Sequence, residues 1–384
     1  MRVIRERIKR TKRAQRFRTP EARVVARVET STEGTILHIG DRKVVTRLID
    51  RSQPTHDVHD YAAFALAAVS MSRNIEIDID FPISIVMAKR LEKIAQVYRL
   101  WSIDMLAPMR VNVKEAVDTT PEPRQGGVIC LSGGLDSMFA AIEAKQEGAV
   151  DHALLIAGAD YETAAAHGFV ELQQRVGGIA EKLGLNLMTV ETDLRRVGFE
   201  WQMLHGFALA YCLHFLSPLV ARGAFALDYT IYQDLMRAPW GNNSAIPPLC
   251  STDHFQLRGY GLYSDRVEKL RRVTETDESL LHHLSICYSD TSTGGNCGRC
   301  RKCLLTRAAL VAIGASEQGL FSETPDIADG IATLPLPTKI PGIRGVMARA
   351  AELADTLPDG RLRDTFVTME EQLRARYLAL MPPN

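Results

Sequence analysis

The chain has 384 residues and carries 46 basic and 46 acidic side chains, so its formal net charge is zero. This length accommodates two domains, and the neutral balance provides no overall field that would draw the chain to nucleic acid or to a membrane surface. No uninterrupted apolar stretch of about 18 residues occurs, which argues against a membrane span. The basic N-terminus lacks the apolar core of a signal peptide, and we therefore expect a cytoplasmic protein.

The first 117 residues are expected to form a small α+β domain, 1–117. Residues 1–18 hold nine Lys or Arg, which predicts either an arm for nucleic acid or a solvated helix. The lack of interleaved aromatic residues favours the helix, so a nucleic-acid partner is not favoured. Short alternating apolar runs in residues 22–49 predict an antiparallel meander. A helix over residues 61–71 and a half-buried strand over residues 75–81 complete this domain.

Residues 118–125 form a polar, proline-bearing linker, and strands and helices alternate after it. The alternation predicts a Rossmann-like α/β domain over residues 126–320, with a parallel sheet covered by helices on both faces. Ligands of such sheets bind at the carboxyl ends of the strands, near the reversal in strand order. The expected strands are 128–131, 153–156, 187–190 and 225–229, and the expected helices are 138–145, 163–183 and 201–220.

The first of these strands is followed by the motif Ser132-Gly133-Gly134-Leu135-Asp136-Ser137, which leads into a helix. A strand that turns through two glycines into a helix presents backbone N–H groups and the positive end of the helix dipole to an anion. We expect the glycines to let a phosphate approach the backbone and the two serines to donate hydroxyl groups. Asp136 repels phosphate, so its expected task is to hold Mg²⁺. A glycine turn without a ligand is the alternative.

Candidates for contacts to phosphates or to a second substrate follow the later strands. Asp160 comes after the second strand, and residues 239–253 form a polar loop that is too long for a simple connection. Arg266 and Lys269 lie on a helix that Ser264 or Asp265 caps, and either one can neutralise a phosphate or a carboxylate. The remaining substrate candidates are His205, Arg237, Trp240 and Asp253. For each of these side chains a structural role is the alternative.

Four of the seven cysteines crowd into one window: Cys287, Cys297, Cys300 and Cys303. An odd total without an export signal argues against a disulfide framework. Four thiolates that end in a C-x-x-C-x-x-C run fit a tetrahedral Zn²⁺ site, and because no coordination position stays open the metal is expected to be structural. An iron–sulfur cluster uses the same ligand set and is the alternative.

The glycine motif and the later cysteine motif together resemble those of 7-cyano-7-deazaguanine synthase and related PP-loop (N-type) ATP pyrophosphatases. The resemblance covers residues 126–314, and it implies an adenine nucleotide alpha hydrolase-like fold. Asp160-Tyr161 stands where that family has an Asp-Tyr pair, and residues 296–303 match its zinc knuckle. Leu204-His205-Gly206 departs from a Gly-Arg-Asn motif of the synthase, so we expect a different acceptor.

The resemblance implies an ATP-dependent ligase. The family's acceptor, usually a carboxylate, attacks the α-phosphate of ATP, pyrophosphate leaves, and ammonia or another nucleophile then displaces AMP. It further implies that residues 132–137 and Asp160 bind ATP and that Mg²⁺ assists. Together with our own candidates Arg266 and Lys269, Asp136 is expected to act in catalysis. We expect a small-molecule or peptide carboxylate as the acceptor.

Two other functions fit the same motifs. Sulfur transfer to tRNA or a nucleobase also occurs on this fold, and it needs a reactive cysteine outside the metal site. Cys250 is the only candidate in a polar loop, since Cys130 and Cys212 fall in apolar elements. A nucleotide-binding module without turnover is the second possibility. The last part of the chain, a proline-rich segment and helical tail over 321–384, is expected to be irregular over residues 322–341 and helical over residues 346–357 and 362–378. The amphipathic faces of these two helices fit packing on the core or association as a homodimer.

Overall fold

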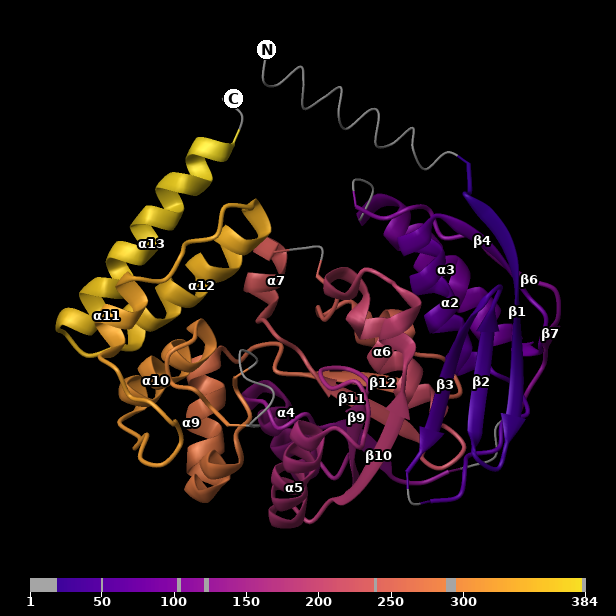
Figure 1. The fold of residues 1–384 in the computed structure, drawn as a ribbon, viewed down its shortest axis with the longest axis horizontal. Coiled ribbons are helices and arrows are strands. Elements are labelled where there is room, and N and C mark those ends of the chain that lie inside the picture. Colours follow the sequence, from indigo (N-terminus) through magenta and orange to yellow (C-terminus); the bar gives the residue numbers. More distant parts are fainter. Residues whose placement is uncertain are drawn as a thin grey trace.

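The computed structural model describes residues 19–49, 51–101, 105–120, 124–237, 240–287 and 295–381. Residues 1–18, for which the sequence predicts a solvated helix or an arm, lie outside this description. The described part is organised around one ten-stranded mixed sheet flanked by helices (Figure 1). The strand order is β12-β11-β8-β9-β10-β3-β2-β1-β4-β6.

Five parallel strands form the part of the sheet that follows the predicted linker. They are β8 (Gly127–Cys130), β9 (His152–Ala157), β10 (Asn186–Thr192), β11 (Arg222–Ala226) and β12 (Gln256–Tyr260). β9 and β10 lie on one side of β8, whereas β11 and β12 lie on the other. The strand order therefore reverses at β8, where sheets of this kind bind their ligands. This arrangement confirms the predicted Rossmann-like α/β class.

Three helices follow the first three of these strands, as the sequence predicts. They are α4 (Leu135–Gln146), α5 (His167–Lys182) and α6 (Trp201–Phe215), the last preceded by a 3-10 turn, Leu194–Val197. α6 ends before residue 220, where the sequence placed its end, because Pro218 cannot continue a helix. β12 was not predicted. It is a short strand at the edge of the sheet, and Gly259 interrupts the alternation of polar and apolar residues.

The residues before the linker extend the same sheet. β1 (Ala22–Ser31), β2 (Gly34–Ile39) and β3 (Arg42–Leu48) form the predicted antiparallel meander. β3 pairs antiparallel with β10, so hydrogen bonds continue across the predicted domain boundary. That boundary stays a prediction. The other elements here are α2 (Asp60–Arg73), β4 (Ile75–Ile79), β5 (Ile83–Ser84), α3 (Ile85–Trp101), β6 (Val111–Val113) and β7 (Ala116–Val117).

One apolar cluster contains residues from both sides of the predicted linker, so it is shared by the N-terminal strands and the parallel strands of the sheet. α2 packs on α6, where the rings of Phe64 and Phe207 stack with their centroids 6.3 Å apart. A buried polar contact crosses the seam between β3 and β10: Thr46 Oγ1 lies 2.9 Å from Thr192 Oγ1 and 2.8 Å from the Tyr211 hydroxyl. Because these hydroxyls satisfy one another away from water, they favour a single register of β3 on β10.

Most of the remaining helices lie on the side of the molecule opposite the N-terminal strands (Figure 1). In chain order they are α7 (Ile231–Arg237), α8 (Ile246–Cys250), α9 (Arg266–Thr276), a 3-10 turn Glu278–His283, α10 (Arg301–Ile313), α11 (Ile327–Ala332), α12 (Ile340–Thr356) and α13 (Arg361–Leu380). α8 interrupts the predicted substrate loop. α11 lies in a proline-rich stretch for which the sequence predicts no regular structure, and Asp326 caps its first turn. Among the described residues, no helix is both long and apolar enough to cross a membrane.

Candidate active site and metal centre

The glycine motif forms the connection between β8 and α4, at the reversal of the strand order. Gly133 has a φ of 76°, in the left-handed region that favours glycine, and Gly134 is the N-cap of α4. Ser285 N–H donates to the Gly133 carbonyl at 2.8 Å and anchors the turn. The first N–H groups of α4 have no partner within the helix. This geometry suits an anion, as the sequence predicts for a phosphate site.

The two serines of the motif mainly hold its shape. The Ser137 hydroxyl donates to the Gly134 carbonyl at 2.9 Å, and it accepts from the Ser132 N–H at 3.2 Å. Its proton is therefore committed inside the loop, which differs from the expected role as a donor to phosphate. Ser132 is exposed, and its hydroxyl lies 3.2 Å from that of Ser137.

Asp136, Lys269 and Arg266 meet beside this turn, although two of them come from α9. Lys269 Nζ lies 2.8 Å from Asp136 Oδ1, and Arg266 Nη1 lies 3.0 Å from Asp136 Oδ2. The Lys269 side chain is only 1% exposed, and its ammonium also donates to the Leu227 carbonyl at 2.7 Å. The structure thus brings together the three residues for which the sequence predicts a catalytic role.

Opposing effects act on the carboxyl group of Asp136. Burial by itself would raise the pKa of Asp136, but the charge of Lys269, followed by that of Arg266, outweighs it. The pKa of Asp136 therefore lies well below its usual range, and the group is a carboxylate at neutral pH.

The expected magnesium site does not fit this arrangement. Both carboxylate oxygens of Asp136 already accept hydrogen bonds from cations. Mg²⁺ binds through free carboxylates together with substrate phosphates, and two adjacent positive side chains oppose a third cation. The residues at this turn therefore do not fit a Mg²⁺ ion held by Asp136.

Local structure explains why α9 presents its cations to the turn. Asp265 caps α9, and its carboxylate accepts from the Glu268 N–H, while the Glu268 side chain accepts from the Asp265 N–H. This capping box fixes the first turn, which begins with Arg266. Gly261 precedes it with a φ of 97°, and a Cβ there would lie 2.9 Å from Lys269 Cε. A glycine at this position therefore leaves room for the lysine stem.

Two further charged residues reach the same region from α12, and the sequence-based prediction missed them. Arg349 and Glu352 pair at 2.9 Å with side chains 12% and 5% exposed. The charge of Arg349 also contributes to the low pKa of Asp136. The sequence shows that they lie three residues apart on an amphipathic helix. An ordinary surface ion pair has the same spacing, so the sequence does not distinguish the two cases.

His205 and Trp240, two of the predicted substrate residues, lie side by side near the end of β11. Their ring centroids are 5.5 Å apart, and Trp240 Nε1 donates to Asp228 Oδ2 at 2.8 Å. Backbone bonds clamp the Trp240 loop on α6: Gly241 N–H donates to the Gln202 carbonyl, and the Gly241 carbonyl accepts from Gly206 N–H. A planar group could stack there, as the sequence suggests for Trp240.

The other predicted contacts are placed differently. Asp253 is exposed and lines a groove of about 430 Å³ along the edge strand β12, together with Arg90 and Arg258. Asp160 is exposed in the segment that follows β9. Arg237 is the last residue of α7, and its side chain lies outside the described part of the structure.

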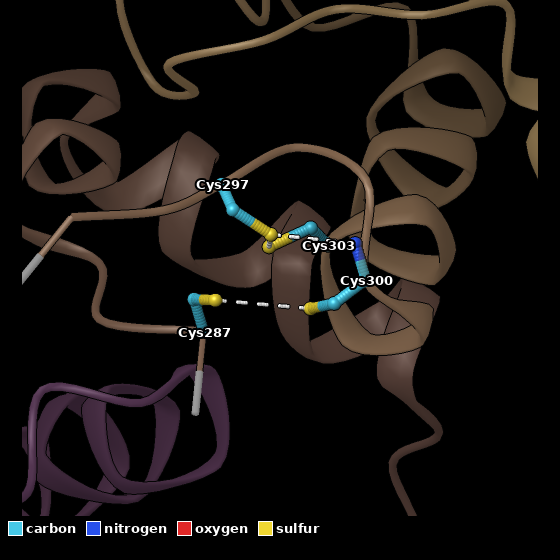
Figure 2. A group of neighbouring side chains, drawn as sticks. All are labelled: Cys287, Cys297, Cys300 and Cys303. Carbon is cyan, nitrogen blue, oxygen red and sulfur yellow. Dashed lines mark hydrogen bonds between the residues drawn. The ribbon is translucent and has the colours of Figure 1, made fainter. Parts of the chain in front are cut away.

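The four clustered cysteines converge as the sequence predicts (Figure 2). All four Sγ atoms lie within 4.8 Å of one another. Cys287 and Cys300 have their Sγ atoms 3.8 Å apart, and those of Cys297 and Cys303 are 3.9 Å apart. A Zn–S bond of about 2.3 Å places the sulfurs of a tetrahedral site about 3.8 Å apart. The cluster therefore fits one Zn²⁺, whereas thiolates bound to different irons of a cluster would stand further apart.

Neighbouring groups shape this cysteine cluster. Asn296 Oδ1 accepts from the Ile286 N–H at 2.8 Å and the Cys287 N–H at 3.3 Å, which joins the two cysteine-bearing segments. The Cys300 N–H points at Cys297 Sγ at 3.3 Å. Gly298 has a φ of 78°, and a Cβ there would come 1.7 Å from the Glu323 carbonyl oxygen. The Ser-, Thr- and Gly-rich residues 288–294, which connect Cys287 to the knuckle, lie outside the described residues.

No protein-family model matches the chain, nor does any of the curated proteins compared with it. Among solved structures, the chain is similar to the NMN synthetase from Francisella tularensis, with 12% sequence identity and a TM-score of 0.28. The match covers 68% of this chain and 90% of the synthetase. Likeness at this level establishes neither a shared fold nor a shared activity.

Proposed function

We propose that the protein is an ATP-dependent ligase that cleaves ATP between its α and β phosphates and transfers AMP to an acceptor. One observation carries the proposal: a strand–SGGLDS–helix turn lies at the reversal of the strand order, beside Lys269 and Arg266. The turn offers backbone N–H groups for the pyrophosphate end of ATP. Cations from α9 neutralise charge that develops on the leaving group.

The chemistry that we propose requires mainly positioning and charge neutralisation. The N–H groups at the start of α4 hold the β and γ phosphates, so that the α-phosphorus faces the open end of the sheet. An oxygen of the acceptor, most simply a carboxylate, attacks the α-phosphorus and pyrophosphate leaves. Ammonia or another nucleophile then displaces AMP from the acyl-adenylate. Asp136 keeps Lys269 and Arg266 in place in this scheme.

The acceptor site that we propose lies near Trp240 and His205, next to the end of β11. An aromatic ring held by a hydrogen bond from its Nε1 to Asp228 presents a rigid face to a planar acceptor. The resemblance to 7-cyano-7-deazaguanine synthase supports a small planar acid among the acceptors, while the departure at Leu204-His205-Gly206 argues against that enzyme's own substrate.

The cysteine cluster, on our proposal, holds a structural Zn²⁺. With four protein ligands no coordination position is open to substrate, so the metal would stabilise the connection between residues 287 and 297. Metal analysis of the purified protein tests this, with about one zinc per chain expected. Iron in place of zinc would contradict it.

Sulfur transfer is less compatible with the cysteines outside this cluster. Cys130, Cys212 and Cys250 are all buried. Burial raises the pKa of each thiol, and that of Cys212 reaches about 12, so none is a thiolate at neutral pH. Cys250, which the sequence placed in a polar loop, is instead the last residue of α8. If Cys250→Ala abolished turnover, the sulfur-transfer alternative would return.

The decisive experiment is a screen for pyrophosphate release with ATP, Mg²⁺, ammonium and a panel of carboxylic acids. We expect at least one acid to give pyrophosphate and AMP in equal amounts, and Asp136→Ala to abolish both. Release of ADP and phosphate would place the cleavage between the β and γ phosphates and contradict the proposal. Tight binding of ATP without turnover over a broad panel would favour the nucleotide-binding module.

A further inference from the structure

Helix α12, in the C-terminal part of the chain, contributes a buried cation to the end of β11. Arg349 Nη2 donates to the Asp228 carbonyl at 2.7 Å, and its guanidinium carbon lies 5.0 Å from the ring centre of Tyr229. Residues 228 and 229 follow β11, the strand that pairs with β8. A residue about 120 positions away in the sequence is thereby fixed at the reversal of the strand order.

Arg349 occupies a position next to that of Lys269. The Leu227 carbonyl accepts from Lys269, and the neighbouring Asp228 carbonyl accepts from Arg349. Two successive carbonyls thus hold cations from two different helices, α9 and α12. Lys269 also contacts Asp136 in the glycine turn at 2.8 Å, so Arg349 lies one carbonyl away from a residue that touches this turn. The positive charge of Arg349 acts on Asp136 as well.

Glu352 connects these cations to each other. Its Oε2 pairs with Arg349 Nη1 at 2.9 Å, and its Oε1 accepts from the Val267 N–H at 3.0 Å. Val267 lies in the first turn of α9, directly after Arg266. One buried carboxylate therefore sets the position of Arg349 and also secures the turn that carries Arg266.

We propose that Arg349 is a further phosphate-binding residue, that it contacts the pyrophosphate end of ATP, and that Glu352 is its positioning residue. The proposal rests on the proposed function and extends it: α12, in the predicted tail, completes the nucleotide site. Glu352 and the Asp228 carbonyl accept two of the five N–H groups of the Arg349 guanidinium, which leaves three donors in a fixed plane for phosphate oxygens. A lysine cannot reproduce this geometry. A purely structural Arg–Glu pair is the competing explanation.

Binding of two probes to the full chain separates these explanations. Inorganic pyrophosphate occupies only the phosphate end of the site, whereas AMP lacks the β and γ phosphates. By calorimetry we expect Arg349→Gln to weaken pyrophosphate binding about ten- to a hundredfold, the range of a hydrogen bond to a charged group. AMP binding should stay within about twofold of the wild type.

Three companion variants sharpen the test. Arg349→Lys keeps the charge but not the fork, and it should weaken pyrophosphate binding less than Arg349→Gln does. Glu352→Gln should weaken pyrophosphate binding while leaving AMP binding unchanged. Arg344→Gln is the matched control, because Arg344 lies on the same helix and over a tyrosine ring, that of Tyr377, at 4.9 Å. It should bind both probes like the wild type.

The possible results lead to different conclusions. If Arg349→Gln binds pyrophosphate as the wild type does, or loses AMP and pyrophosphate equally, the role is structural and this inference is wrong. If Arg349→Gln does not fold, Arg349→Lys provides the test. An affinity of Arg349→Lys for pyrophosphate equal to that of the wild type then overturns the inference. A wild-type protein that binds neither ATP nor pyrophosphate contradicts the proposed function itself.

Discussion

The stability of each buried charge at the candidate site depends strongly on its ion-pair and hydrogen-bond partners. Lys269 is almost fully buried, and an ammonium in that position is stable only because Asp136 and the Leu227 carbonyl surround it. Removing one partner of a buried ion pair leaves the other charge desolvated, whereas removing both partners is far less costly. The pair should therefore show strong coupling.

We expect Lys269→Met to lower the free energy of unfolding by about 3–5 kcal/mol, because Asp136 then keeps only Arg266 as a direct ion-pair partner. The double variant Asp136→Asn/Lys269→Met should lose less stability than the losses of Asp136→Asn and Lys269→Met added together. Urea unfolding of the wild type, the two single variants and the double variant measures the coupling. Additive losses would mean that the pair is not an interacting unit.

Gly298 provides a second prediction at this scale. Its left-handed backbone and its closeness to the Glu323 carbonyl leave no space for a side chain between Cys297 and Cys300. Gly298→Ala should therefore distort the knuckle and reduce the zinc content well below one per chain. Gly314, at the end of α10, has a φ of 71°, and a Cβ added there would meet no atom within 4 Å.

Gly314→Ala is the control for that experiment. It introduces the same strained backbone, at a cost of about 1 kcal/mol, without the clash. Its zinc content should match the wild type. Equal zinc loss in both variants would show that general destabilisation, and not the shape of the knuckle, controls metal binding.

At the scale of the helix, the position of each candidate-site side chain depends on how its helix begins as well as on which face it occupies. α9 begins with a capping box directly before Arg266, and α11 begins with a similar cap in which Asp326 accepts from the Asp329 N–H. Both caps satisfy N–H groups that a helix leaves without partners. Only the cap of α9 borders the candidate site.

We expect Asp265→Ala and Asp326→Ala each to lower the free energy of unfolding by about 1 kcal/mol. Only Asp265→Ala should also weaken pyrophosphate binding, because the turn that carries Arg266 loosens. Thermal unfolding and calorimetry on both variants check this. Weakened binding in Asp326→Ala would argue that the effect is not specific to α9.

At the scale of the whole molecule, the ten-stranded sheet joins the segments that the sequence separates at residues 118–125. β3 covers the edge of β10, and α2 covers the apolar face of α6. A chain that begins at residue 126 would expose an unpaired strand edge and the core residues around Phe207. The two segments are therefore expected to depend on each other for solubility.

We expect the fragment 126–384 to aggregate or to unfold at a markedly lower temperature than the full chain. Size-exclusion chromatography and thermal unfolding of both proteins provide the measurement. A soluble, monomeric fragment that still binds ATP would instead support two independent domains with a boundary at the linker, as the sequence predicts.

Two features followed from the sequence alone because their residues are close in the chain. The turn at residues 132–137 and the knuckle at residues 297–303 are local structures. In each, the glycines and the candidate site residues lie only a few positions apart in the sequence. Apolar periodicity likewise predicted the α/β class, since a buried parallel strand and an amphipathic helix have different patterns. β12 was missed because a short edge strand has too little of either pattern.

Tertiary structure alone decided which charges meet. Asp136 and Lys269 are 133 positions apart, and Thr46 and Thr192 are 146 apart. Contacts at such separations depend on the order of the strands and on the packing of helices, which no local pattern encodes. Arg349 and Glu352 resemble an ordinary surface pair in the sequence. The packing of α12 against α7 and α9 buries them, and on our proposal it adds the C-terminal tail to the candidate site.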